Sequence, residues 1–315
     1  MIRLPTERAG PRLADWIELE LLFGGHDGLA QAEIESILGD DLGLEEAWTL
    51  HDQDDPSAPP AEPDDSRELI QGRVEQALMA LEGRRRRTGD QYPIGPHGPR
   101  VVVDRDWRDR PEFAFLALLS ARVTFQLGAV IDAHEPALLF ERLVKTALRN
   151  YLNGEAARFG WPLDGEFDGD IYERIATLAS LMREHPQREF RSVSTDGKDH
   201  GLDVAAWAPF DDRGSQVIVL CQCGIGSDFR EKVLPERRWP DLIRFLAPTT
   251  TALAVPFEDF GGRNSDTAWN SLAIDAGILL DRSRLTRFAD ASAEPNLIQA
   301  LVGWVDQSLP HFLED

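Results

Sequence analysis

The sequence predicts an α/β fold in which a mixed sheet is flanked by helices, joined to a mainly helical N-terminal domain. Beyond about residue 165, segments with apolar residues at helical spacing alternate with short apolar runs typical of strands. Two of these runs, 201–207 and 216–223, flank a turn-forming segment at 211–214 and therefore predict adjacent strands. Residues 1–160 instead carry mainly helical periodicity.

The chain is predicted to divide into a helical recognition or assembly domain, residues 1–160, and a second domain, residues 161–315. The first domain contains an acidic segment at 51–65 with four prolines and five aspartates, which is typical of a solvated linker. Segment 16–23 alternates like a strand, with a helix as the alternative. Helices are expected over 29–38, 66–81, 111–127 and 137–152, and a short strand over 101–103.

Four consecutive arginines, Arg84 to Arg87, follow the helix predicted over 66–81. Cations near a helix C-terminus interact favourably with the helix dipole, so a solvated basic run is the preferred interpretation. Contact with a phosphate or with an acidic partner is the alternative.

The second domain is predicted to order its elements as helix, three strands, helix and strand, which indicates a mixed sheet with helices on both faces. The first helix covers 170–184, and segment 228–246 is mostly helical but interrupted near Pro235 and Pro240. Strands are expected over 189–194, 201–207, 216–223, 251–257 and 276–280. Terminal helices are expected over 283–290 and 295–308.

The charge balance restricts the class of partner. The 315 residues carry a net charge of −22. This charge argues against a protein that binds nucleic acid over its whole surface, because neutralisation of the phosphates drives such binding. A local basic groove or a partner subunit can still supply positive charge. No apolar run approaches the roughly 20 residues of a membrane span, and the N-terminus lacks a secretory leader. The only two cysteines, Cys221 and Cys223, favour a reduced, cytoplasmic location.

Two polar side chains interrupt the apolar strands of the second domain. Asp203 lies on the strand at 201–207 and Gln222 on the strand at 216–223. Unpaired burial of such groups costs roughly 2–7 kcal/mol, and a divalent metal ion would satisfy both oxygens. Mg²⁺ or Mn²⁺ suits this pair of hard ligands. An ordinary strand-end carboxylate and an amide bonded to neighbouring backbone are the alternative interpretations.

At these residues the chain resembles the PD-(D/E)xK restriction-endonuclease-like superfamily, in particular its Mrr-like branch, over about 165–257. The resemblance implies an αβββαβ core in which Asp203 is the metal-binding aspartate and Gln222 takes the Glu/Gln position of the motif. Gly224 stands where the superfamily has a lysine. Lys232, on the helix expected next, is the candidate that replaces it.

The resemblance also implies an acidic metal ligand on the first helix of the core. By chain order this is Glu173, with Glu141 as the alternative if the core starts earlier. The predicted catalytic set is therefore completed by Glu173, and the same acid joins Asp203 and Gln222 as a metal ligand.

By this resemblance we expect a metal-dependent nuclease, or a nuclease subunit, of a bacterial anti-phage or restriction system that hydrolyses DNA phosphodiesters. DNA would be bound with help from partner proteins of the same locus, and oligomer formation is left open. The alternative is a catalytically inactive nuclease-fold interaction subunit of a defence complex, which Gly224 and the acidic composition favour. A small-molecule enzyme on an α/β core is the third hypothesis.

Overall fold

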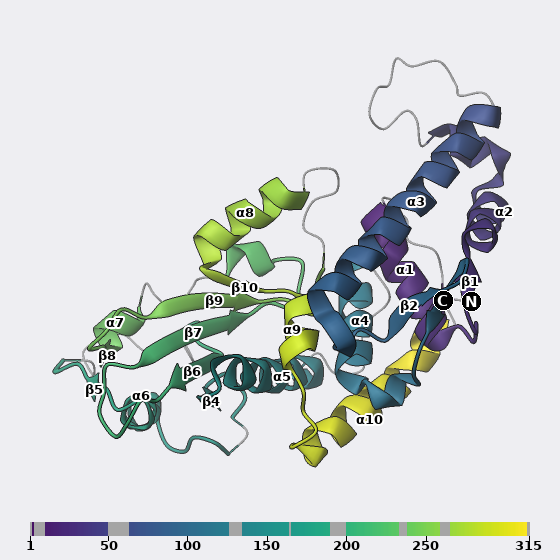
Figure 1. The fold of residues 1–315 in the computed structure, drawn as a ribbon. Helices are drawn as coiled ribbons and strands as arrows, with labels where there is room; N and C mark the ends of the chain where they lie inside the picture. The colour runs from purple at the N-terminus through teal and green to yellow at the C-terminus, as the bar shows by residue number, and fades with distance from the viewer. Residues whose placement is uncertain are drawn as a thin grey trace.

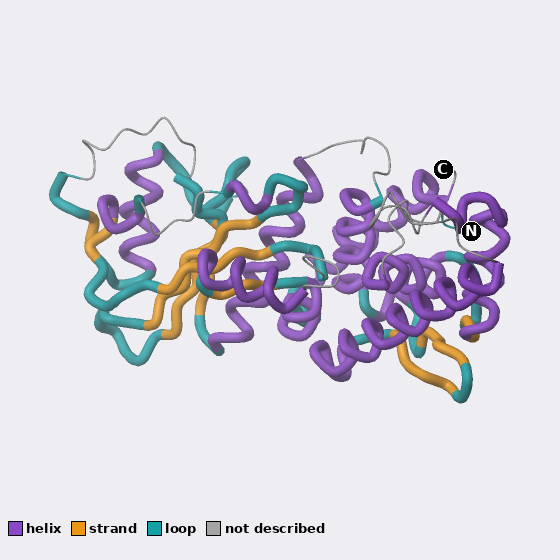
Figure 2. Tube along the Cα trace, turned by 90° about the horizontal axis from the view of Figure 1, so that it is seen from above, coloured by secondary structure: helices purple, strands orange, loops and turns teal. Residues whose placement is uncertain are grey.

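The computed structural model describes residues 2, 10–49, 63–125, 134–163, 165–189, 200–232, 238–258 and 265–313. Figure 1 shows a sheet with its covering helices in one half of the molecule and a group of packed helices in the other. The view from above in Figure 2 separates the same two halves and shows a small hairpin under the helices.

The central sheet has five strands in the order β10-β9-β7-β6-β4. Neighbours β4, β6 and β7 are antiparallel, whereas β7, β9 and β10 run parallel to one another. The strands are β4 (Glu155–Arg158), β6 (Val204–Ala208), β7 (Val217–Cys223), β9 (Thr250–Ala254) and β10 (Ile278–Leu280). The predicted mixed sheet flanked by helices is therefore confirmed.

Helices cover both faces of this sheet because successive strand residues point to opposite sides and both sides are apolar. Helix α5 (His134–Leu152) packs on the face formed by Val204, Ala206, Val219 and Cys221. Helices α6 (Ile171–Leu181) and α7 (Trp239–Leu242) pack on the opposite face, which includes Ala205, Trp207, Ile218 and Leu220. Helix α8 (Ser265–Ala276) covers β9 and β10.

The helical half uses both ends of the chain. It contains α1 (Gly10–Phe23), α2 (Gln31–Thr49), α3 (Pro63–Thr88), α4 (Pro111–Thr124), α9 (Arg282–Phe288) and α10 (Pro295–Leu313). Strands β1 (Leu29–Ala30), β3 (Arg100–Val103) and β2 (Ile94–His97) form a small antiparallel sheet beside these helices, and short 3-10 helices cover Gly89–Gln91 and Trp107–Asp109. Apolar side chains of α1, α4, α5, α9 and α10 share one hydrophobic core.

This arrangement differs from a boundary at residue 160. Strand β4 ends at Arg158, yet it pairs with β6 in the central sheet, and α5 covers that sheet. In the other direction α10 returns to pack on α4. The tertiary core therefore draws on both sides of the predicted boundary.

Segment 16–23 belongs to helix α1, so its strand-like alternation has another cause. The residues from Leu13 to Leu22 are all buried, including the acidic Glu18 and Glu20. Glu20 accepts a hydrogen bond from the backbone N–H of Ile2, and Glu18 contacts two arginines. The alternating acids are buried and paired, and do not form the solvent face of a strand.

Segment 228–246 is less helical than predicted. Its described part holds a 3-10 helix, Phe229–Glu231, the four-residue α7, and strand β8 (Ile243–Arg244) paired with β5 (His185–Pro186). Helix α7 stops early because the next two residues enter this pairing. The strand predicted over 189–194, apart from residue 189, and most of the predicted 51–65 linker lie outside the described residues.

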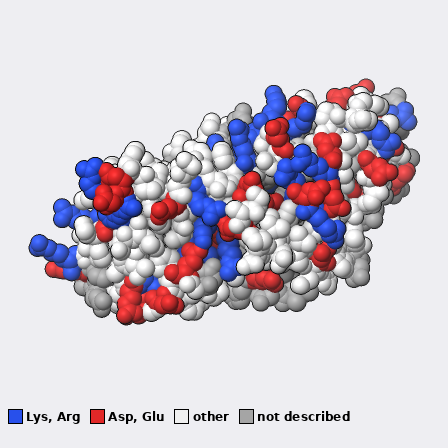
Figure 3. Space-filling model, turned by 60° about the horizontal axis from the view of Figure 1, so that its bottom comes forward, with Lys and Arg blue, Asp and Glu red and all other residues white. Residues whose placement is uncertain are grey.

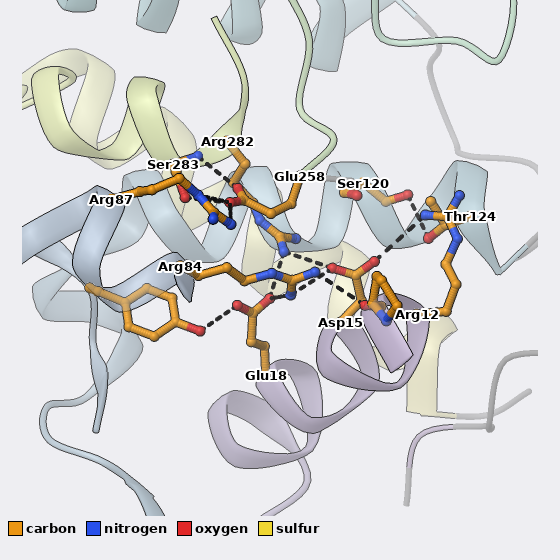
Figure 4. Close-up of polar contacts among 12 residues, drawn as sticks. Arg12, Asp15, Glu18, Arg84, Arg87, Ser120, Thr124, Glu258, Arg282 and Ser283 are labelled. Atoms are coloured by element: carbon orange, nitrogen blue, oxygen red, sulfur yellow. Dashed lines mark hydrogen bonds and ion pairs between the residues drawn. The ribbon is translucent and has the colours of Figure 1, made fainter. Parts of the chain in front are cut away.

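A buried charge network joins α1, α3 and α9 (Figure 4). Arg84 Nη1 lies 3.0 Å from Asp15 Oδ1 and 2.9 Å from Glu18 Oε2. Arg282 Nη2 lies 2.7 Å from the same two oxygens. The Tyr92 hydroxyl donates to Glu18 Oε1 at 2.6 Å. None of the four charged residues exposes more than 4% of its surface, so the network is a buried link between helices α1, α3 and α9.

The network corrects the interpretation of the four-arginine run. Helix α3 continues to Thr88, so Arg84 and Arg87 lie about one turn apart along the helix, Arg84 buried and Arg87 about half exposed. Arg84 is 1% exposed, and Arg87 Nη2 pairs with Glu258 Oε1 at 2.8 Å. Arg84 is therefore a buried structural charge and not part of a solvated run, whereas Arg87 stays partly exposed while pairing with the buried Glu258.

We expect the stability of the protein to fall as the pH rises from about 5 to about 8, because of Asp281. Burial first, and then the neighbouring Glu258 carboxylate, raise the pKa of Asp281 to about 7, while Arg284 and Arg87 act in the opposite direction. An unfolded aspartate titrates near 3.9, so the folded state holds an extra proton between the two values. The resulting stability is present below about pH 4 and lost as the pH passes about 7.

The Asp281→Asn variant isolates this effect. Asparagine can still accept the N-cap hydrogen bond from the Arg284 N–H, which is 2.8 Å long. Urea unfolding at about pH 5 and about pH 8 should show a loss of roughly 2–4 kcal/mol in the wild type and a much smaller loss in the variant. An equal loss in both proteins would assign the pH dependence to other groups.

Candidate functional site

Asp203 lies at the entrance of β6, directly beside the end of β7. Its N–H donates to the Cys221 carbonyl at 3.0 Å, and its Oδ2 accepts from the Cys223 N–H at 2.7 Å. Pairing of Val204 with Cys221 in an antiparallel register sets Asp203 next to Gln222. The structure thus places these two predicted site residues on adjacent strands.

Gln222 brings an amide oxygen into this strand end. The residue is 9% exposed, and its Oε1 accepts no hydrogen bond from any described residue. The alternative, in which this oxygen accepts a hydrogen bond from neighbouring backbone, is therefore not seen. Leaving a buried acceptor unsatisfied costs about 1–3 kcal/mol. A buried acceptor of this kind is suited to a ligand that brings a cation or a donor.

The acid that accompanies Asp203 is Glu141 of α5, not Glu173. A Cβ atom on Gly160 would lie 2.4 Å from Glu141 Oε2 and 3.2 Å from Asp203 Oδ1, so the two carboxylates flank the same point. Glu173 is exposed at the start of α6, where it forms a capping box: its Oε2 accepts from the Asp170 N–H and its own N–H donates to Asp170 Oδ1, both at 2.9 Å.

The choice between the two acids depended on which strand comes first in the sheet. Strand β4 precedes α6, so the helix that leads into the sheet is α5. No local pattern marks β4 in the sequence, because Glu155–Arg158 is short and contains two alanines, which are weak strand formers. The available signal was the Phe140–Glu141 pair on a helix with one strongly apolar side.

Arg158, a residue that sequence analysis missed, completes the surroundings of Glu141. Its Nε lies 2.7 Å from Glu141 Oε2, and its side chain is only 1% exposed. Its Nη1 donates to the Pro162 carbonyl at 2.8 Å, and its backbone N–H donates to Glu166 Oε2 at 2.7 Å. Arg158 is therefore fixed between α5 and the loop that contains Gly160.

The structure gives a reason for Gly224 at the motif lysine position. A Cβ atom there would lie 2.7 Å from Phe229 Cβ and 3.3 Å from Phe229 Cα, so no side chain fits without moving the 3-10 helix. Lys232 caps the C-terminal end of that helix and is half-buried. It therefore comes from the 3-10 segment that packs over the strand end and not from a regular helix.

The field of the carboxylates reaches the last residue of β7. Burial, the neighbouring Cys221 thiol and then the carboxylates of Asp203 and Glu141 raise the pKa of the Cys223 thiol. Cys221 and Cys223 are both free thiols. Two carboxylates therefore lie at this end of the sheet, and the Arg158 guanidinium balances the charge of one of them.

The fit to a divalent metal rests on oxygen donors alone. Among the described residues, no three His, Cys, Asp or Glu side chains gather closely enough to hold a metal ion. The set formed by Asp203, Glu141 and Gln222 has two carboxylates and one amide, which are hard ligands suited to Mg²⁺. The unsatisfied Gln222 oxygen supports the fit, and Arg158 is a cation already in contact with one donor.

Comparison with known proteins gives no family for this chain. No family model, no curated protein and no solved structure matches it. Within the described parts of the chain, no helix combines the length and apolarity that a membrane crossing needs.

Proposed function

We propose that this chain is a metal-dependent nuclease, or a nuclease subunit, of the PD-(D/E)xK type that hydrolyses DNA phosphodiesters in a bacterial anti-phage or restriction system. The strands of the central sheet and their helices follow the order α5, β4, α6, β6, β7, α7 and β9, with β5 and β8 in a separate small sheet. This order supports the proposal because it is the αβββαβ order of that superfamily with α6 inserted after β4. The single observation that carries the proposal is the meeting of Glu141 and Asp203 at Gly160. The strand register adds Gln222, which lies opposite Asp203 and has an unsatisfied amide oxygen.

In this proposal Asp203, Gln222 and Glu141 hold Mg²⁺ or Mn²⁺. When bound, the ion supplies polarisation of the phosphate and a water of lowered pKa. Asp203 is fixed for this role through the Cys223 N–H, which leaves Oδ1 on the side of Gly160. Lys232 orients the attacking water or the phosphate from the 3-10 segment, in place of a lysine at Gly224.

The surface charge sets an expectation for DNA affinity. On the face that Figure 3 shows, basic and acidic side chains are interspersed, and the whole chain carries a net charge of −22. Because phosphate neutralisation drives nucleic-acid binding, we expect the isolated chain to bind DNA weakly and with a steep dependence on salt. Partner proteins of the same locus would supply further positive charge, with the helical half serving recognition or assembly in the cytoplasm.

We expect the purified protein to cleave DNA in the presence of Mg²⁺ or Mn²⁺ and to be inactive in EDTA. The Lys232→Ala variant should cleave at least about 100-fold more slowly, because a positioned proton-transfer group contributes roughly 10²–10⁴-fold to the rate. Cleavage of plasmid and linear DNA is followed with any partner subunits present. Arg230→Ala removes one exposed cation from the same 3-10 helix and is the matched control. Full activity of Lys232→Ala would rule out the relocated lysine but not the metal site.

A second function, that of an inactive nuclease-fold interaction subunit, is favoured by two observations. Gly224 has no room for the motif lysine, and Arg158 already pairs with Glu141. In that case neither metal supports cleavage even with partners, while deletion of the chain still abolishes assembly of the complex. Pull-down of the locus proteins, run beside the cleavage assay, separates the two functions.

A further inference from the structure

We propose that Arg158 is the internal counter-ion of this site: its guanidinium neutralises Glu141 in the metal-free protein, and a divalent cation must displace it from Glu141 in order to bind. The inference rests on the proposed metal site and adds a positioning residue that controls how tightly the site is loaded.

The contact is built to hold Glu141. Arg158 Nε lies 2.7 Å from Glu141 Oε2, with side-chain exposures of 1% and 9%. The guanidinium is also oriented by a hydrogen bond from Nη1 to the Pro162 carbonyl. Gly160 leaves room for the carboxylate, because a Cβ atom there would lie 2.4 Å from the same Oε2. The oxygen that faces Asp203 across Gly160 is thus the oxygen that Arg158 occupies.

A more exposed ion pair made by another residue of α5 shows how the Arg158–Glu141 pair differs from an ordinary surface pair. Arg149 Nη2 and Glu294 Oε1 are also close, at 2.8 Å, but their side chains are about one-third exposed. Water screens such a pair, whereas the Arg158–Glu141 pair lies where the effective dielectric constant is low. Substitution of Arg158 should therefore have a large effect on the affinity of Glu141 for a divalent cation.

Competition follows from the charges. A guanidinium and a divalent ion cannot both sit on one buried carboxylate oxygen without strong repulsion between them. An arginine is never deprotonated in proteins, so it leaves Glu141 only by moving. The neutral Arg158→Gln removes the competitor and leaves Glu141 with uncompensated charge, which the metal then neutralises.

The experiment measures metal binding directly, by calorimetric titration of the full-length protein with Mn²⁺. We expect the Kd of Arg158→Gln for Mn²⁺ to be at least about tenfold lower than that of the wild type. Added Mn²⁺ should also raise the Tm of the variant by more than it raises the Tm of the wild type. The double variant Glu141→Gln/Arg158→Gln should lose this gain. Arg149→Gln, which breaks the exposed pair on the same helix, should bind as the wild type does.

Two results would overturn the inference in different ways. If the wild type binds Mn²⁺ and Arg158→Gln binds it no more tightly, Arg158 is not a competitor, although the metal site stands. If neither the wild type nor any variant binds Mn²⁺, the metal site fails together with the inference. Should Arg158→Gln fail to melt cooperatively, Arg158→Lys replaces it: loss of the Nε contact should lower the Kd several-fold, and an unchanged or higher Kd overturns the proposal.

Discussion

Replacement of Asp203 with asparagine is expected to lower Mg²⁺-dependent DNA cleavage about 1000-fold or more. The substitution removes a negative charge from the proposed metal site, where the ion supplies several kcal/mol of stabilisation to the transition state. A loss of about 4 kcal/mol corresponds to a factor of about 1000 in rate. The asparagine oxygen can still accept from the Cys223 N–H, so we expect the fold to persist.

The measurement compares initial rates of plasmid cleavage and, in cells, protection against phage by the complete locus. Asp211→Asn is the matched control, because Asp211 lies in the turn between the same two strands, is not one of the proposed metal ligands and pairs with the neighbouring Arg213. Equal protection by the Asp203→Asn assembly would exclude the nuclease function. The interaction-subunit function would then account for the chain.

Replacement of Arg282 with methionine is expected to lower the free energy of unfolding by about 3–5 kcal/mol, the cost of breaking a buried ion pair by removing one partner. Arg282 contacts both Asp15 and Glu18, and so does Arg84. Glu18 would then keep only Arg84 of these two arginines, while Asp15 would keep Arg84 and the more distant Arg12. Burial raises the pKa of Glu18 and the arginines oppose it, so loss of one arginine also favours protonation of Glu18. Because the total free energy of unfolding of a protein is about 5–15 kcal/mol, the expected loss is a large fraction of it.

Urea unfolding measures the loss, and the slope of the transition shows whether the variant still unfolds in one step. Arg108→Met is the control, since Arg108 pairs with Asp306 through side chains about half exposed, and such a pair contributes no more than about 1 kcal/mol. Adding Glu18→Gln to Arg282→Met should recover part of the loss, because one unpaired charge disappears. A loss below about 1 kcal/mol for Arg282→Met would show that the network is not stabilising.

Local pattern predicted several elements well. The helices around 111–127 and 137–152 appear as α4 and α5, and the apolar runs at 216–223 and 251–257 appear as β7 and β9. These segments have one dominant environment, a buried face or a buried strand, so periodicity alone identifies them. Segment 16–23 was ambiguous because α1 is buried on all sides and its acids are paired within the core.

The candidate site was predicted in part for the same reason. Asp203 and Gln222 stand out in the sequence because each interrupts an apolar run, and a hairpin between two neighbouring strands brings them together. The matching acid required knowledge of which helix leads into the sheet. Because β4 is short and pairs with a strand about 50 residues later, no local pattern distinguished Glu141 from Glu173.

The sequence by itself determined the alternation of helices and strands, the mixed sheet and the pair of polar residues at the strand ends. Only the tertiary structure decided that Arg84 and Arg282 are buried counter-ions and that Arg158 forms an ion pair with Glu141. It also decided that Phe229 packs so closely on Gly224 that no side chain fits there. The physical reason is that periodicity reports the environment of one element. A buried charge is defined instead by partners from distant elements, whose positions depend on the packing of the whole chain.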